Sequence, residues 1–245
     1  MSSLEQLRIV EDPEIFRQQC RERFLETGYV CLDETQVGVD PFFRQSVTHD
    51  YFSQLGPEWP GVLPADRRRA YDILDFSKDA GGVLLSSAYS EFYPTSPAAI
   101  GHHPPVGTHR QYPRLSILED ARFVDWTKAM FSLIPPKFEP IRASGQIKVD
   151  FFRTSTTIVT SPHRDGWPVV IIYVINRHGG GAETRLYSAD NPEQEVFRTT
   201  LDPGRIIMLD DTRVLHSATP LIPAAEGRAQ RDAIICVIGS PPLGG

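Results

Sequence analysis

The sequence has no long apolar run, few cysteines and no excess of positive charge. Its longest apolar run, Val169 to Ile175, is far too short to cross a bilayer. The segment Met1 to Glu11 lacks the apolar stretch of a signal peptide. The three cysteines are scattered without a CxxC pair, which excludes a disulfide framework and is typical of a reducing compartment. These absences predict a soluble cytoplasmic protein that has no contact with a membrane.

The charge balance argues against a nucleic-acid partner. The net charge is −6, whereas nucleic-acid-binding proteins usually carry a basic surface. The one basic cluster, Arg67-Arg68-Arg69, is expected on a solvated face of a helix or loop. A chain of 245 residues buries enough apolar surface to fold without a structural metal. We therefore expect a globular protein that does not bind nucleic acid and whose partner is a small molecule, with a peptide substrate as the alternative.

Helical patterns are confined to the first half of the chain. Apolar residues recur at helical spacing over residues 13–27, and Pro13 and Gly28 mark the two ends of that helix. A short strand is expected at Tyr29 to Leu32. Pro135 and Pro136 end the last helical pattern. Further helices are expected over residues 40–53 and 119–134.

From Gly145 onward the pattern changes to short strands separated by Gly, Pro, Asn and Asp. About eight such strands at regular spacing predict a sandwich or barrel. The expected fold is an all-β core, a jelly roll or double-stranded β-helix, with N-terminal and flanking α-helices. We expect one domain over residues 1–245, in which a helical and loop-rich part (1–140) packs on a jelly-roll core (141–240).

His163 and Asp165 are the first candidate metal ligands. In an extended strand, residues two positions apart project to the same face, so these two side chains point together. One imidazole and one carboxylate supply two ligands of a 2-His-1-carboxylate triad, which leaves open positions on iron(II). A surface His-Asp pair that arises by chance is the alternative reading.

The third ligand is expected from a strand that lies beside the first in the fold. His216, in the strand Arg213 to Ala218, is the candidate. Distant strands become neighbours in a jelly roll, so the long sequence separation between His163 and His216 is no obstacle. The alternative is that these histidines are exposed to solvent or form hydrogen bonds with other groups and bind no metal.

An enzyme that uses 2-oxoglutarate also needs a cation for the distal carboxylate of that molecule. Arginine suits this role because its planar fork binds a carboxylate through two hydrogen bonds. Arg231 directly precedes the strand Ala233 to Ile238 and is preferred over Arg228, which lies in a polar turn. Tyr173 is a second candidate for the same carboxylate, and a core aromatic is the alternative reading of that residue.

Several segments together resemble the iron(II)/2-oxoglutarate dioxygenase superfamily. Within it, the chain looks like the group that contains the bacterial L-isoleucine dioxygenase, over roughly residues 110–240. The shared elements are an HxDG motif, an apolar strand ending in INRH, a Gly-Gly pair, an LY strand, a DxRxxH segment and an Arg-Asp pair. In this chain they are His163-Arg164-Asp165-Gly166, Ile175-Asn176-Arg177-His178, Gly180-Gly181, Leu186-Tyr187, Asp211-Thr212-Arg213-Val214-Leu215-His216 and Arg231-Asp232.

The resemblance implies an enzyme that uses Fe(II), 2-oxoglutarate and O₂ and releases succinate and CO₂. It implies hydroxylation of an unactivated C–H bond in a free L-amino acid or a close derivative. Desaturation or ring closure by the same oxidant is an alternative. Two residues depart from the family pattern: Arg164 replaces an expected Gln, and the bulky Trp167 is expected to narrow the substrate pocket.

A free amino acid needs a cation for its carboxylate and an acid or carbonyl for its amine. Gln146, Lys148 and Asp150 share one face of a strand and are candidates for lining the pocket. The solvent face of an edge strand is the alternative reading. Arg153, Arg213 and Arg110 are further candidate carboxylate anchors.

Two function classes compete with the oxygenase. In a cupin-like zinc hydrolase, His163, Asp165 and His216 would hold zinc and activate water, and Arg231 would have no necessary role. In a non-catalytic jelly-roll binding module, the complete ligand set would have no purpose.

Overall fold

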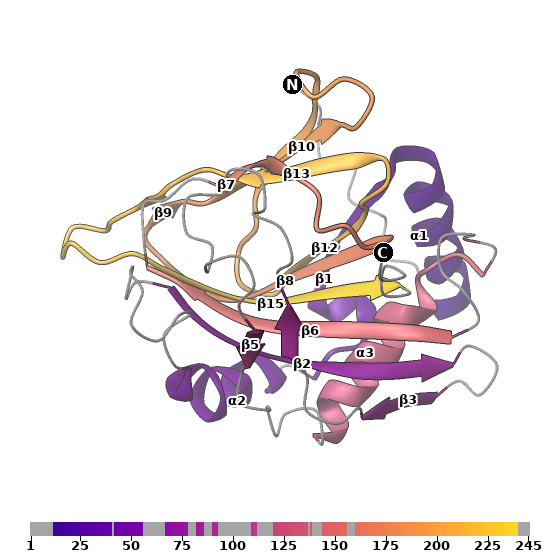
Figure 1. Cartoon of the computed structure of the whole chain (residues 1–245), viewed down its shortest axis with the longest axis horizontal. Helices are drawn as coiled ribbons and strands as arrows, with labels where there is room; N and C mark the ends of the chain where they lie inside the picture. Colours follow the sequence, from indigo (N-terminus) through magenta and orange to yellow (C-terminus); the bar gives the residue numbers. More distant parts are fainter. Residues whose placement is uncertain are drawn as a thin grey trace.

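A computed structural model shows two packed antiparallel sheets with helices on one side (Figure 1). It describes residues 12–40, 42–55, 67–77, 82–85, 90–92, 109–111, 120–136, 138, 144–155 and 160–239. All strand pairs among these residues are antiparallel. No helix in these ranges is long and apolar enough to cross a membrane.

The larger sheet has seven strands in the order β1-β12-β8-β15-β6-β2-β3. Its central strands come from the second half of the chain, and β1, β2 and β3 come from the first half. The strands are β1 (Tyr29–Asp33), β2 (Arg67–Ser77), β3 (Gly82–Leu85), β6 (Ser144–Thr154), β8 (Val169–His178), β12 (Arg205–Asp210) and β15 (Gln230–Gly239).

The smaller sheet has four strands in the order β11-β10-β13-β7 and lies over one face of the larger sheet (Figure 1). Its strands are β7 (Thr160–His163), β10 (Glu183–Ser188), β11 (Glu195–Thr200) and β13 (Val214–Ala218). Two further pairs are β9 (Gly180–Gly181) with β14 (Leu221–Ile222), and β4 (Ser90–Phe92) with β5 (His109–Gln111).

Among the described residues, three α-helices cover the other face of the larger sheet: α1 (Pro13–Thr27), α2 (Phe43–Asp50) and α3 (Ala121–Ser132). Helix α1 begins where the Asp12 side chain accepts the backbone N–H of Glu14, and it ends at Gly28, whose φ is +82°. Short 3₁₀ helices, η1 (Glu34–Val37) and η2 (Phe52–Gln54), follow β1 and α2.

The larger sheet separates two apolar clusters, because successive side chains of a strand point to opposite faces. On β8, Val169, Ile171 and Tyr173 face the helices, whereas Val170 and Ile172 face the smaller sheet. The side chains that face the smaller sheet line the space between the two sheets. That space is where residues from both layers can converge on one ligand.

The structure confirms the predicted jelly-roll class and the strands expected from residue 146 onward, except that residues 156–159 of the second of these strands lie outside the described residues. The helices predicted over 13–27, 40–53 and 119–134 are also present, within a few residues at their ends. The prediction for Arg67–Arg69 was wrong, because these residues begin strand β2 rather than a helix or loop. The N-terminal part therefore does more than pack on the core: it adds strands to both edges of the main sheet.

Candidate metal centre

The two candidate histidines are direct neighbours on adjacent strands. His163 ends β7 and lies opposite His216 of β13 in the strand register. Their ring centroids are 4.3 Å apart, as expected for residues that face each other across an antiparallel pair. Antiparallel pairing thus brings together two imidazoles that lie far apart in the sequence.

Asp165 completes the group from the turn that follows β7. Its carboxylate oxygens lie 3.7 Å from His163 Nε2 and 3.6 Å from His216 Nε2. One ligand atom from each of the three residues lies within 4.8 Å of the others. The strand ends at His163, so Asp165 reaches the group from a turn rather than from the extended strand that the sequence predicted. Gly166, with φ +80°, gives this turn the left-handed conformation that it needs.

The hydrogen bond of His163 sets its tautomer. His163 Nδ1 lies 2.8 Å from the Ser161 carbonyl oxygen, which only accepts, so Nδ1 carries the proton. The unprotonated Nε2 then faces Asp165. Burial, and then the charge of nearby His216, lower the pKa of His163, so the ring is neutral near neutral pH.

His216 is the more buried of the two histidines, with 8% of its surface exposed. Burial lowers its pKa, but the carboxylates of Asp211 and Asp165 outweigh this effect and raise the pKa overall. Two imidazoles and one carboxylate form the donor set of non-haem iron(II) sites, which leaves further positions for other ligands. The three residues therefore fit iron(II).

Arg231 lies on β15 of the larger sheet, on the face that looks toward the smaller sheet. Its neighbour on the same face, Ala233, belongs to the apolar cluster between the sheets. The Nε and Nη2 atoms of Arg231 are buried and have no hydrogen-bond partner among the described residues. The Arg231 charge also acts on the pKa of His216, which places it near the metal ligands. Two buried guanidinium nitrogens with unused donors fit a carboxylate ligand.

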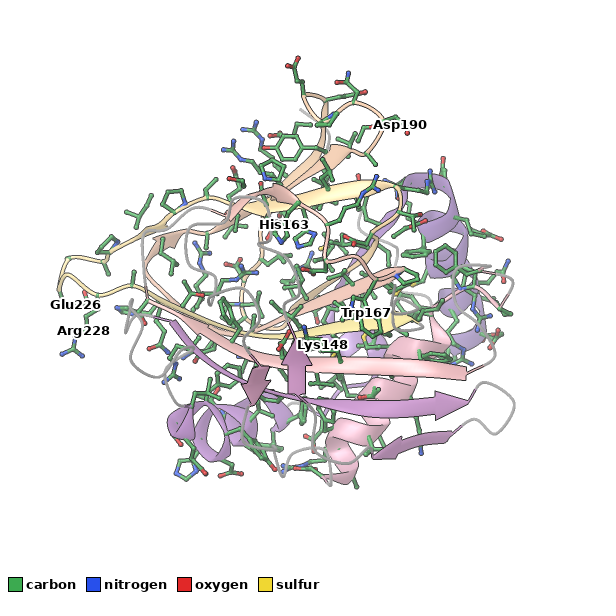
Figure 2. The ribbon with its side chains drawn as sticks, viewed as in Figure 1. Lys148, His163, Trp167, Asp190, Glu226 and Arg228 are labelled. Carbon is green, nitrogen blue, oxygen red and sulfur yellow. The ribbon has the colours of Figure 1, made fainter. Side chains whose placement is uncertain are left out.

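The residue after Arg231 does not neutralise it. Asp232 points to the opposite face, is fully buried, and accepts two hydrogen bonds from Arg153 at 2.7 and 2.8 Å. This pair uses Arg153, which the sequence had left as a possible carboxylate anchor. Arg228, the alternative to Arg231, lies exposed at the tip of the loop after β14 (Figure 2).

The structure does not bring Tyr173 to the metal ligands. Its ring faces the helices, where it stacks on Trp126 and Phe43, and its hydroxyl donates to Glu34 Oε2 at 2.5 Å. Burial, and then Glu34, raise the pKa of Tyr173 far above its ordinary value. The alternation of β8 side chains explains this position, because Val170, Ile172 and Val174 occupy the face toward the smaller sheet.

Arg213 also lies away from the metal ligands. Its guanidinium donates to the carbonyl oxygens of Leu25 and Glu26 at 2.6 and 3.0 Å, at the C-terminal end of α1. It thereby satisfies carbonyl groups that a helix leaves free at this end.

Trp167 packs against the apolar cluster between the sheets, close to Gly239 at the end of β15.

Lys148 and Asp150 lie on β6, and their side chains are on the face of the larger sheet that looks toward the smaller sheet. Their register partners, Val237 and Ile235 on β15, belong to or pack on the cluster between the sheets. Strand β6 lies between β15 and β2, so the alternative reading of an edge strand facing solvent was wrong. Asp150 is only 6% exposed. Gln146 belongs to the same strand, and its side chain, like that of Arg110, lies outside the described residues.

Figure 2 marks His163 on the smaller sheet and Lys148 on the larger sheet. The metal ligands come from the smaller sheet and the turn after β7, and Arg231, whose charge acts on His216, comes from the larger sheet. Sequence reasoning missed one buried residue beside it, Asp211, whose Oδ1 lies 3.7 Å from His216 Nδ1. A signal was present, since Asp211 opens the DxRxxH segment, but aspartate is common in turns that have no part in a functional site.

Comparison with known proteins agrees with this geometry. The family model described as 2OG-Fe dioxygenase matches residues 60–237. No curated protein sequence matches the chain.

Several solved structures share the fold. A BsmA homologue from Methylobium petroleophilum PM1 superposes with a TM-score of 0.78 at 24% identity, covering 94% of this chain and 95% of its own. The protein IDO from Bacillus thuringiensis gives 0.64 at 16% identity, with 92% and 99% covered. The Fe(II)/α-ketoglutarate-dependent dioxygenase TqaL gives 0.66 at 13% identity, with 97% and 93% covered. The family match spans well over half of the sequence, and the chain therefore belongs to the 2OG-Fe dioxygenase family of oxidoreductases, which use iron(II), 2-oxoglutarate and O₂.

Proposed function

We propose that this enzyme hydroxylates an unactivated C–H bond of a free L-amino acid or a close derivative. In this proposal His163, Asp165 and His216 hold the iron, and Arg231 holds 2-oxoglutarate. The observation that carries the proposal is the convergence of three ligand atoms within 4.8 Å of one another. When bound, iron(II) with 2-oxoglutarate and O₂ supplies the oxidant, and succinate and CO₂ are released.

The three ligands reach the site from one edge of the smaller sheet. Leu186, the register neighbour of His216 on β10, is fully buried beside that histidine. Apolar neighbours of this kind exclude water and so strengthen the electrostatic interactions within the site.

The surroundings of Arg231 support its assignment as the residue that binds the distal carboxylate of 2-oxoglutarate. An unpaired charge in a protein interior is unfavourable, and a bound carboxylate would supply the missing hydrogen bonds. Arginine gives this contact a fixed direction, since its planar fork binds a carboxylate in one orientation. A zinc hydrolase gives this buried guanidinium no role.

Lys148 and Asp150 support the amino-acid substrate. They lie two positions apart on β6, so both side chains are on the face toward the smaller sheet. A cation and a carboxylate on one wall complement the carboxylate and the ammonium group of a free amino acid. Trp167 lies near the end of this wall and would limit the length of the substrate side chain.

The proposal is tested by turnover with a panel of free amino acids. The protein is loaded with iron(II) and 2-oxoglutarate without oxygen, each L-amino acid is added, and succinate is measured after air is admitted. We expect one or a few amino acids to stimulate succinate release and to gain one oxygen atom in mass. A product that has lost two hydrogens would indicate desaturation or ring closure instead. If no amino acid raises succinate above the background, the substrate proposal is wrong.

A further inference from the structure

Asp211 is a buried carboxylate that the proposed function does not use. It follows β12 in the turn that leads to β13, and only 2% of its surface is exposed. Within the described ranges no lysine or arginine forms an ion pair with it, and the His216 ring is the basic group within ion-pair distance of its carboxylate. A buried carboxylate without a cation is unfavourable, so a compensating contact is expected.

Asp211 holds the turn that carries Asp165. Its Oδ2 accepts the backbone N–H of Gly166 at 2.9 Å, and its own backbone N–H donates to the Pro168 carbonyl at 3.1 Å. These two hydrogen bonds lie on either side of Trp167. They fix the backbone immediately after the carboxylate ligand.

The other oxygen of Asp211 faces the second histidine ligand. Asp211 Oδ1 lies 3.7 Å from His216 Nδ1. Both atoms are buried, and neither has a hydrogen-bond partner among the described residues. A small rotation of either side chain brings the two atoms to hydrogen-bond length, and each is the natural partner of the other.

His163 shows the same arrangement with a different acceptor. Its Nδ1 donates to the Ser161 carbonyl oxygen, which leaves Nε2 toward Asp165. In His216, Nε2 likewise faces Asp165, and Nδ1 faces Asp211. A ring that binds a metal through Nε2 keeps its proton on Nδ1 and needs an acceptor there.

The charges also agree with this role. Asp165 and Asp211 together carry two negative charges, and two imidazoles that bind a metal are neutral. A divalent cation among them gives a neutral group in a partly buried site. A filled metal site therefore supplies a counter-charge for Asp211.

We propose that Asp211 is a positioning residue for the metal site: it fixes the Nδ1–H tautomer of His216 and, through Gly166, ties His216 to the turn that carries Asp165. This inference rests on the proposed function, because it requires a metal at the three ligands. Acceptors of this kind strengthen metal binding by ~10- to 100-fold in other proteins.

The test compares Mn(II) affinity of the full-length parent, D211N and D210N by electron paramagnetic resonance, without 2-oxoglutarate. In D211N the amide can keep the Gly166 hydrogen bond but loses the negative charge beside His216. We expect its Mn(II) dissociation constant to rise ~10- to 100-fold. Asp210 provides a matched control, because it is also buried and accepts from Thr212 in the same turn. D210N should bind Mn(II) within about twofold of the parent, since its carboxylate contacts no ligand.

Equal affinity of D211N and the parent would overturn the inference and leave the proposed function standing. Equal weakening in D210N and D211N would also overturn it, since the effect would then come from the turn. If the parent itself binds no Mn(II), the proposed function fails and this inference fails with it.

A second measurement does not depend on whether a variant folds. In the Zn(II)-loaded, ¹⁵N-labelled parent, nuclear magnetic resonance reports which nitrogen of each histidine ring carries the proton. We expect His216 to be protonated at Nδ1 and to bind the metal through Nε2. A His216 ring that binds through Nδ1 would overturn the proposal, because Asp211 would then face the wrong nitrogen.

Discussion

Arg231 and Arg177 lie directly opposite each other on the neighbouring strands β15 and β8, and each has a buried Nε–H with no hydrogen-bond partner among the described residues. Burial, and then the charge of Arg177, lower the pKa of Arg231 to about 10. Arg177 is itself fixed by Asp202 and by the Gly181 carbonyl oxygen. Arg231 has no such partner among the described residues, so an anion bound there relieves both its burial and its repulsion from Arg177.

The first prediction concerns Arg231. Arg231→Ala should raise the KM for 2-oxoglutarate by about 100-fold, because hydrogen bonds to a charged group contribute ~1.5–3 kcal/mol. The KM for the primary substrate should change far less. Steady-state succinate release at varied 2-oxoglutarate measures this effect.

A matched control for this variant is Arg228→Ala, which removes an exposed arginine from the loop before β15. It should leave both KM values unchanged. Arg231→Lys should fall between the parent and the alanine variant, since it keeps the charge but loses the planar fork. An unchanged KM for 2-oxoglutarate in Arg231→Ala would place the anchor elsewhere.

The second prediction concerns His216. His216→Ala should lose stoichiometric iron binding and all oxygenase activity, because two ligands remain where the site needs three. Anaerobic iron titration and succinate release measure the two effects. His178→Ala provides the control, since His178 is exposed and pairs with Glu226 outside the metal site. Full activity in His216→Ala would show that His216 is not a metal ligand.

The sequence predicted which three side chains lie together better than it predicted the architecture around them. Periodicity identified the strands, and His163, Asp165 and His216 follow from the HxD spacing and a later histidine. The contribution of β1, β2 and β3 to the main sheet was not fully foreseen, because strand order depends on pairing between distant segments. Single-sequence periodicity assigns local structure and carries little information on such pairing.

Tyr173 shows a second limit of sequence reasoning. It lies in a run of apolar residues that is buried on both faces, so alternation does not reveal which face is which. The structure directs Val170 and Ile172 to the space between the sheets and Tyr173 to the helices. Asp211 was missed for a related reason, since its role depends on two contacts from different segments.

The third prediction separates the two readings of Tyr173. Tyr173→Phe should leave the KM for 2-oxoglutarate unchanged and lower the free energy of unfolding by ~1–3 kcal/mol, because buried Glu34 loses a donor. Arg44 still donates to Glu34 in the variant, which keeps the loss moderate. Chemical denaturation and 2-oxoglutarate kinetics measure the two quantities. A clear rise in the KM for 2-oxoglutarate would show that Tyr173 contributes to binding of the co-substrate.

The last prediction concerns the pH dependence of stability at the start of α3. Asp120 accepts the backbone N–H of Arg122 and pairs with the Arg122 guanidinium; the side-chain contact first, and the backbone hydrogen bond after it, hold the pKa of Asp120 below its ordinary value of 3.8. A carboxyl whose pKa is lowered on folding stabilises the protein above its unfolded pKa, and this contribution is lost as pH falls through the folded pKa. Asp120→Ala should therefore cost ~1 kcal/mol of unfolding free energy at pH 7 and progressively less below pH ~4.

Urea denaturation at several pH values measures this difference between the parent and Asp120→Ala. Asp120→Asn is the matched variant, because asparagine also caps a helix but carries no charge. It should retain most of the stability at pH 7, and its loss relative to the parent should vanish in acid. A difference between the parent and Asp120→Ala that stays constant down to pH ~2 would show that the Asp120 charge plays no part, because the cap alone would not respond to protonation in this way.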